Sequence, residues 1–159
     1  MVLPDFERQV KDSDLIVHGK VEKIESYDDE GRMMTKALIV VVEIFKCRDC
    51  GKSDKVTVVV PGGEDGRFAQ IAVGAPRFLT GEEVILFLEK KNGESFIVNS
   101  LSFGKWTVKV EDGKKSVSRQ VDGVKFFEDT DSGLAPVSVP EIETFEFQEF
   151  VNKIKNIKF

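Results

Sequence analysis

The stretch that decides the fold runs from Gly74 to Glu89 and reads GAPRFLTGEEVILFLE. A lead-in rich in glycine and proline ends in five consecutive apolar residues, Val84 to Leu88, with charged residues on both sides. Five residues are too few for a buried helix, so the run predicts a strand buried on both faces, in the middle of a sheet. The pair Asn92-Gly93 that follows is typical of a tight hairpin turn. We therefore expect a β core with this strand at its centre.

Four other segments have the pattern of strands, and a further hairpin is expected after them. The four segments are 14–24, 35–46, 55–60 and 95–100, and the hairpin pairs 105–110 with 116–121 around Asp112-Gly113. Gly19 interrupts the first segment, and its apolar residues then change phase. This change indicates a bulge of the kind found where a sheet curls toward closure. The outward positions of the hairpin are basic and polar, so we expect the hairpin to be peripheral.

Both ends of the chain are expected to form short helices. In residues 4–11 the apolar side chains have helical spacing, and in residues 144–158 they do so again, with Thr144 as the expected N-cap. Residues 61–80 have neither a helical nor a strand period and contain many glycines and prolines. A loop of this length inside a compact domain is often functional. Residues 129–139 are expected to form another loop.

Composition places the chain among globular domains. Of its 159 residues 41% are hydrophobic and 32% are charged, which fits one domain spanning residues 1–159. The net charge of −5 argues against a nucleic-acid partner, because phosphate binding requires a basic surface. No apolar run reaches the length needed to span a membrane, so no transmembrane segment is expected. No cofactor motif is recognisable, we expect no cofactor, and the oligomeric state stays open.

Three passages resemble a group of secreted bacterial and archaeal proteins. Residues 12–21 resemble the strand ADLVVxGxV near the start of these proteins, and residues 101–106 resemble their LSxGKF segment. Residues 60–64 and 74–84 resemble their core, VPGGE…GAPxFxxGEEVLLFL. The resemblance covers nearly the whole chain. It implies a secreted, periplasmic or cell-envelope protein made with a signal peptide that the sequence shown does not include, while the residues themselves leave a cytoplasmic location open.

More remotely, the strand pattern is similar to the OB-fold of the tissue inhibitors of metalloproteinases and of netrin-like modules. With the five strand-like segments, this similarity implies a mainly β, single-domain, five-stranded OB-like barrel. An extra β-hairpin and short N- and C-terminal helices complete the expected fold. The inhibitors bind the zinc ion of the protease through an N-terminal cysteine, whereas this sequence starts Met1-Val2-Leu3-Pro4. That mechanism therefore transfers to no residue of this chain.

The motif Cys47-Arg48-Asp49-Cys50 has three interpretations. Two thiolates in one tight loop can reach a single zinc ion, but a tetrahedral site needs four ligands. The chain has no other cysteine and a single histidine, His18, so such a site would have to be shared across a dimer. In an oxidising compartment the pair favours a local disulfide, and redox chemistry is the third interpretation. We expect a disulfide or an inert thiol pair, with no metal site.

The residues expected to contact a partner lie in loop 61–80 and in the nearby hairpin. They are Glu64, Asp65, Arg67, Arg77 and Phe78 in the loop, and Trp106 in the hairpin. The two acids could contribute to a calcium site, but their spacing matches no known calcium loop. The simpler interpretation is a glycine loop whose shape is set by turn geometry and packing.

The sequence favours a binding role over catalysis. It has one histidine, no nucleophile next to a base and no cofactor motif, so no catalytic residue is expected. A barrel that presents one long loop is typical of binding proteins. We expect a non-enzymatic extracytoplasmic module that binds an unidentified protein or envelope component, with protease inhibition as the most specific form of this role. The alternative is a metal-binding or redox-responsive protein that uses Cys47 and Cys50.

Overall fold

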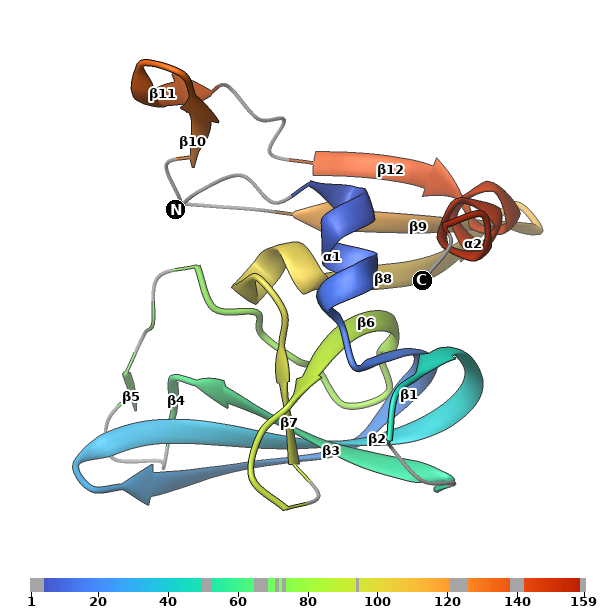
Figure 1. Ribbon diagram of the computed structural model, residues 1–159. Coiled ribbons are helices and arrows are strands. Elements are labelled where there is room, and N and C mark those ends of the chain that lie inside the picture. The colour runs from blue at the N-terminus through green and yellow to red at the C-terminus, as the bar shows by residue number, and fades with distance from the viewer. Residues whose placement is uncertain are drawn as a thin grey trace.

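The protein is mainly β, with a short helix near each end of the chain (Figure 1). The computed structural model describes residues 5–49, 53–64, 69–70, 72, 74–93, 95–120, 126–137 and 142–157. Eight strands of this part form one sheet in the order β1-β2-β3-β7-β6-β8-β9-β12. The mainly β architecture and the terminal helices that the sequence predicts are confirmed.

Five strands of the sheet close into a ring. They are β1 (Leu15–Asp29), β2 (Arg32–Cys47), β3 (Lys55–Pro61), β6 (Glu83–Lys90) and β7 (Ser95–Val98). The ring closes because β1 pairs with β6 as well as with β2. All neighbours are antiparallel except β3 and β7, which run parallel over a short contact. These strands match the five segments that the sequence predicts.

Strand β6 is the centre of the sheet, as predicted. It pairs with β1 along one edge and with β7 and β8 (Lys105–Glu111) along the other. All five apolar residues from Val84 to Leu88 are buried. The turn at Asn92-Gly93 joins β6 to β7, and Gly93 has a positive φ of 66°. Val84, Leu86 and Leu88 belong to one core, whereas Ile85 and Phe87 belong to a second. Alternate side chains of β6 therefore enter two separate cores.

Bulges bend β1 and β2 so that the ring can close. The β1–β2 register shifts at three places, one of them between His18 and Gly19, where the sequence predicts a bulge. A Cβ atom at Gly19 would lie 2.6 Å from the carbonyl oxygen of Val40, so the two strands approach too closely there for any side chain. A bulge combined with glycine is the usual means of coiling a strand around a closed sheet.

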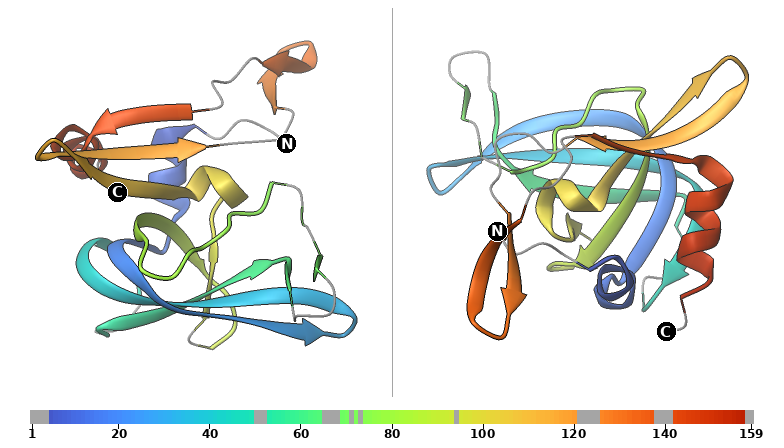
Figure 2. Two further views of the ribbon diagram at one scale, coloured as in Figure 1. Left: turned by 180° about the vertical axis from the view of Figure 1, so that it is seen from behind. Right: turned by 90° about the horizontal axis from the view of Figure 1, so that it is seen from above.

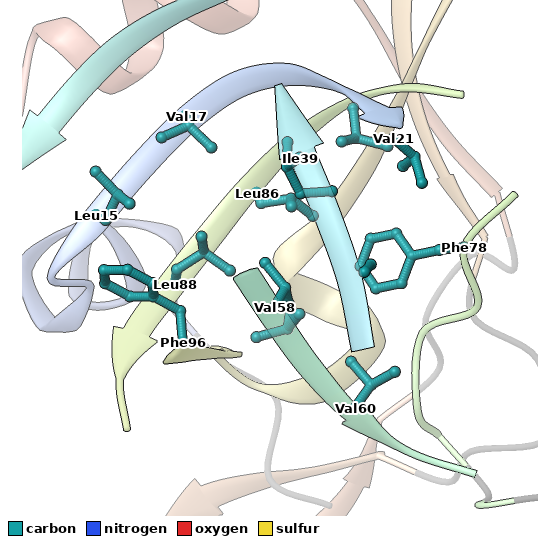
Figure 3. Packing of buried hydrophobic residues seen from close by; sticks show 13 residues of the cluster. Leu15, Val17, Val21, Ile39, Val58, Val60, Phe78, Leu86, Leu88 and Phe96 are labelled. Atoms are coloured by element: carbon teal, nitrogen blue, oxygen red, sulfur yellow. The ribbon is translucent and has the colours of Figure 1, made fainter. Parts of the chain in front are cut away.

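The first core fills the ring (Figure 3). It is built from inward side chains of the ring strands and from Phe78, which enters from the loop before β6. The labelled members are Leu15, Val17, Val21, Ile39, Val58, Val60, Phe78, Leu86, Leu88 and Phe96. Successive side chains of a strand point to opposite faces of the sheet, and this alternation explains the set. Leu15 and Val17 point inward, whereas Ile16 between them belongs to the second core.

The second core lies outside the ring and corrects the prediction of a peripheral hairpin. Strands β8 and β9 (Lys114–Gln120), with β12 (Ile142–Glu146), form a layer above the ring in Figure 1 and in the left view of Figure 2. Their apolar face packs with α1 and α2 against the outer face of β1 and β6. Trp106 is 1% exposed in this core. The hairpin is therefore structural on its apolar face, although its outer face is polar.

Helix α1 (Phe6–Asp12) begins and ends with specific polar contacts. The Asp5 carboxylate accepts a hydrogen bond from the Glu7 amide at 3.1 Å and forms the N-cap. At the other end, the buried Lys46 ammonium donates to the carbonyl oxygens of Val10 and Lys11, both at 2.8 Å. A cation at this end also complements the helix dipole.

Two further predictions near the C-terminus are wrong. Residues 129–139, expected to be a loop, include most of a hairpin formed by β10 (Phe126–Thr130) and β11 (Gly133–Val137). Helix α2 (Phe147–Lys155) begins later than expected, because Thr144 lies in β12 and pairs with Ser118 of β9. The N-cap is Glu146, whose carboxylate accepts from the amides of Gln148 and Glu149 at 3.1 and 3.0 Å.

Candidate functional site

A partly open cavity of about 370 Å³ lies between the loop that precedes β6 and the ends of β1, β2 and β3. The short strands β4 (Gly63–Glu64) and β5 (Ala69–Gln70) pair with each other, and residues of both line the cavity. Figure 1 shows where the two strands lie in the fold. Its described lining residues are Ile24, Ser26, Thr35, Val60, Pro61, Gly62, Gly63, Glu64, Ala69, Gln70, Ala72, Ala75, Pro76, Arg77 and Phe78. We call this cavity the loop pocket.

The loop pocket has both apolar and polar walls, and its hydroxyl groups already have partners. The Thr35 hydroxyl donates to the carbonyl oxygen of Gly62 at 2.7 Å, and the Ser26 hydroxyl lies 3.3 Å from the Thr35 hydroxyl. Ser26 also accepts from the amide of Glu64 at 3.3 Å. The remaining walls combine apolar groups of isoleucine, valine, alanine and proline with the backbone of Gly62 and Gly63 and the side chains of Glu64, Gln70 and Arg77, and Phe78 joins the pocket to the first core.

Gly63 explains why the loop approaches the β1–β2 hairpin so closely. It has a φ of 145°, and a Cβ atom there would lie 2.6 Å from the oxygen atoms of both Ser26 and Thr35. The Pro61-Gly62-Gly63 sequence therefore serves backbone geometry, in agreement with the simpler interpretation of this glycine loop. One result of that geometry is the loop pocket itself.

A buried ion pair fixes the other end of the loop. The ammonium group of Lys105 lies 3.0 Å from the carboxylate of Glu82, and these side chains are 13% and 12% exposed. Lys105 also donates to the carbonyl oxygen of Arg77 and lies 5.2 Å from the centre of the Phe78 ring. Nearby, the Gly81 amide donates to the carbonyl oxygen of Val21 at 2.7 Å. These contacts hold Phe78 in place as part of the pocket wall.

Two opposite charges at the loop pocket are available to a ligand. Glu64 and Arg77 both line it, and both are exposed. Within the part of the chain that the structure describes, neither has an ion-pair partner. A ligand with an apolar group in the pocket could therefore pair polar groups with either side chain without breaking an ion pair of the described residues.

The structure brings together three of the six residues that the sequence selects as binding candidates. Glu64, Arg77 and Phe78 line the same pocket. Trp106 belongs to the second core and does not line it. Asp65 and Arg67 lie outside the described residues.

Sequence reasoning misses the pocket residues that the neighbouring strands contribute. Ser26 and Thr35 face each other across the β1–β2 hairpin and are hydrogen-bond partners of the loop. In the sequence they are ordinary polar residues of an amphipathic strand. The position of loop 61–80 over that hairpin depends on ring closure, and no local pattern shows it.

Neither Cys47 nor His18 lines the loop pocket. Cys47 is disulfide-bonded, and Cys50, the other cysteine of the sequence, lies outside the described residues. His18 is buried on the outer face of the ring, with its Nε2 atom 3.1 Å from the carboxylate of Glu83 and its ring 5.2 Å from that of Phe147. Among the described residues, no group of three or more potential ligands could hold a metal ion.

Comparison with known proteins gives no relative: no protein-family model matches the sequence, and no curated protein matches it. Within the described residues, no helix has the length and apolar character needed to cross a membrane.

Proposed function

We propose that this protein is a non-enzymatic binding module that recognises its ligand through the loop pocket. The single observation that supports the proposal most is the pocket itself, a cavity at the end of a ring of strands that combines apolar walls with two charges that have no ion-pair partner among the described residues. In this proposal the ring is an OB-like barrel. The strand order β1-β2-β3-β7-β6, closed by β1 and with β3 and β7 parallel, supports that assignment.

Two features favour binding over catalysis. Pockets at the mouth of a small barrel, on loops fixed by a rigid scaffold, are common ligand sites. The sequence has one histidine, and His18 lies in contact with α2 through Phe147 instead of at the pocket. The pocket hydroxyls of Ser26 and Thr35 have no described base as a partner, which argues against nucleophilic catalysis.

We further propose an extracytoplasmic location and, as the partner, a protein or an envelope component. The disulfide bond of Cys47 supports the location, because disulfides persist mainly in oxidising compartments. It also weakens the alternative of a metal site at the cysteine motif, since a disulfide sulfur is not a thiolate ligand. A protease-inhibitor-like role is the narrowest form of the proposal and would use the loop instead of the chain terminus.

A protein-observed NMR screen tests the proposal. Amide spectra of the ¹⁵N-labelled protein are recorded with a library of small fragments and short peptides. We expect hits that shift the amides of Ser26, Thr35 and Phe78, and that are lost in Ala75→Phe, which fills the pocket. The matched control is Ala135→Phe in β11, away from the pocket lining, which should retain them. The proposal would be refuted by hits that bind Ala75→Phe as well as they bind the wild type, or by the absence of any hit at these amides.

A further inference from the structure

Among the residues that the structure describes, no strand pairs with one edge of β1 over its second half, and we call this the free edge. On the side opposite β2, β1 pairs with β6 from Leu15 to Lys20, and Val21 then bonds to the backbone of Gly81 and Glu82. From Glu22 to Asp29, no described strand pairs with this edge. An unpaired edge presents a row of backbone donors and acceptors that an extended chain can use.

The free edge borders the loop pocket. Ile24 and Ser26 belong to this half of β1, and both line the pocket. In a sheet, side chains of neighbouring strands at matching positions point to the same face. A strand added beside residues 22–29 would therefore direct alternate side chains toward the face on which the pocket lies.

The far end of the same edge is acidic. Asp28 and Asp29 end β1, and Glu30 begins the turn to β2, with all three exposed. None of the three has an ion-pair partner among the described residues. Arg32, the first residue of β2, is the only cation of the segment 28–32, so this segment carries three carboxylates and one guanidinium. Glu22 and Glu25, by contrast, are paired with Lys55 and Lys36.

We propose that the loop pocket and this edge together bind an extended peptide segment that adds to β1 as a further strand. A bulky apolar side chain of the peptide enters the pocket and packs against Phe78. Basic side chains of the peptide that lie two or three residues from this apolar side chain face Asp28 and Asp29. The reason is that Asp28 and Asp29 follow the pocket residue Ser26 by two and three residues, and each strand advances about 3.3 Å per residue. The inference rests on the proposed binding function and specifies its ligand.

The chemistry of the pocket favours this occupant over a polar small molecule. The hydroxyls of Ser26 and Thr35 and the side-chain oxygen of Gln70 already have partners, so the wall formed by Ile24, Val60, Ala75 and Phe78 offers a ligand apolar contact. Backbone hydrogen bonding at the edge provides affinity without regard to sequence, and the pocket provides selection for one apolar side chain. The acidic end adds electrostatic complementarity for a basic segment.

The test begins with a phage-displayed library of random nonapeptides selected on the intact protein. We expect enriched peptides with a bulky apolar residue and a lysine or arginine two or three positions from it. Their affinity should fall at least tenfold in Ala75→Phe and stay within twofold in Ala135→Phe. The charge reversal Asp29→Lys should weaken binding several-fold, whereas Asp131→Lys, an exposed acid in the β10–β11 turn, should not.

Backbone methylation of one selected peptide separates strand addition from simple insertion of a side chain. In an added strand, every second amide donates to the edge of β1 and the others face away. N-methylation at successive positions should therefore alternate between a loss of at least about tenfold and little change, since each affected site loses a hydrogen bond and gains a clash.

Each outcome decides between the two proposals. If peptides bind in a pocket-dependent way without the alternating pattern, strand addition is refuted and the pocket function stands. If no peptide is enriched while fragments still bind the pocket, only the peptide inference is refuted and the pocket function stands. If no ligand of any class responds to Ala75→Phe, both proposals fall.

Discussion

At the scale of single residues, Gly63 determines whether the loop pocket forms. Gly63→Ala would place a methyl group 2.6 Å from the oxygen atoms of Ser26 and Thr35, at a φ of 145°. Gly113→Ala is the matched control, because Gly113 also has a positive φ, of 76°, but has no atom within 4 Å of its Cβ position. We expect Gly63→Ala to destabilise the protein by about 1–3 kcal/mol more than Gly113→Ala does, from the added overlap.

Urea unfolding of the two variants measures this difference. The same Gly63→Ala variant should also move the NMR amide signals of Ser26 and Thr35, since the loop must shift away from their hydroxyls. Equal stability of the two alanine variants, with unchanged signals at both residues, would show that the close approach is not required.

Glu89 gives a prediction about pH. Burial, and then the negative charges of Asp14 and Asp12, raise the pKa of the Glu89 carboxyl above its ordinary value of 4.5. A raised pKa means that the folded protein holds this proton at pH values where the unfolded chain has lost it. The contribution of Glu89 to stability is therefore full below pH 4.5 and is lost as pH rises through the raised pKa.

We accordingly expect Glu89→Gln to be more stable than the wild type at pH 7 and equally stable below pH 4.5. The amide oxygen of glutamine can still accept the hydrogen bond that Asn99 donates to Glu89 at 3.2 Å. Urea unfolding at several pH values measures the difference, with Glu111→Gln, at an exposed position of β8, as the control. If Glu89→Gln were more stable than the wild type by the same amount at all pH values, the effect would not come from ionisation of Glu89.

Residue identity alone predicts part of the candidate site. Glu64, Arg77 and Phe78 stand out in the sequence because they lie in a long loop without a regular period. Trp106 is misassigned because a lone tryptophan beside lysines is equally typical of a surface contact and of a core. The difference depends on which layer covers the strand, and only the packed structure shows this layer.

At the scale of elements, α2 shows how far periodicity reaches. Helical spacing predicts its buried face, and Phe150, Val151 and Ile154 are indeed buried. Its start is mispredicted because Thr144 is a common N-cap residue, whereas strand pairing with β9 extends through Glu146. The long-range pairing outweighs the local preference at this boundary.

Two alanine substitutions test the position of this cap. Glu146→Ala should cost about 1 kcal/mol, because the amides of Gln148 and Glu149 lose their acceptor. Thr144→Ala should cost less, since Thr144 is exposed and caps nothing. Chemical denaturation of both variants decides the question, and a larger loss for Thr144→Ala would place the start of the helix where the sequence suggests.

The other mispredicted elements have a related cause. The β8–β9 hairpin was expected at the periphery because its polar residues alternate with apolar ones, a pattern that describes any half-buried strand. The second core that covers its apolar face is assembled from α1, α2, β1 and β6, which are far apart in the sequence. The β10–β11 hairpin has no strong alternation, so the sequence suggests a loop there.

At the scale of the whole molecule, ring closure links the predicted strands to the unpredicted pocket. Five strand segments and the bulge at Gly19 can be predicted locally, but the pairing of β1 with β6 joins residues about 70 positions apart, such as Leu15 and Leu88. That pairing ends at Lys20, and beyond it no described strand lies on that side of β1. The loop pocket and the free edge both lie beyond the point where the pairing of β1 with β6 ends.

The central claim is that the loop pocket is the ligand site, and the most direct test is the affinity of one ligand for three proteins. Isothermal titration calorimetry with a ligand from the NMR or peptide selection is performed on the wild type, Ala75→Phe and Ala135→Phe. The account predicts that Ala75→Phe loses at least tenfold in affinity while Ala135→Phe binds like the wild type, with both variants folded by circular dichroism. Unchanged affinity of folded Ala75→Phe would contradict it.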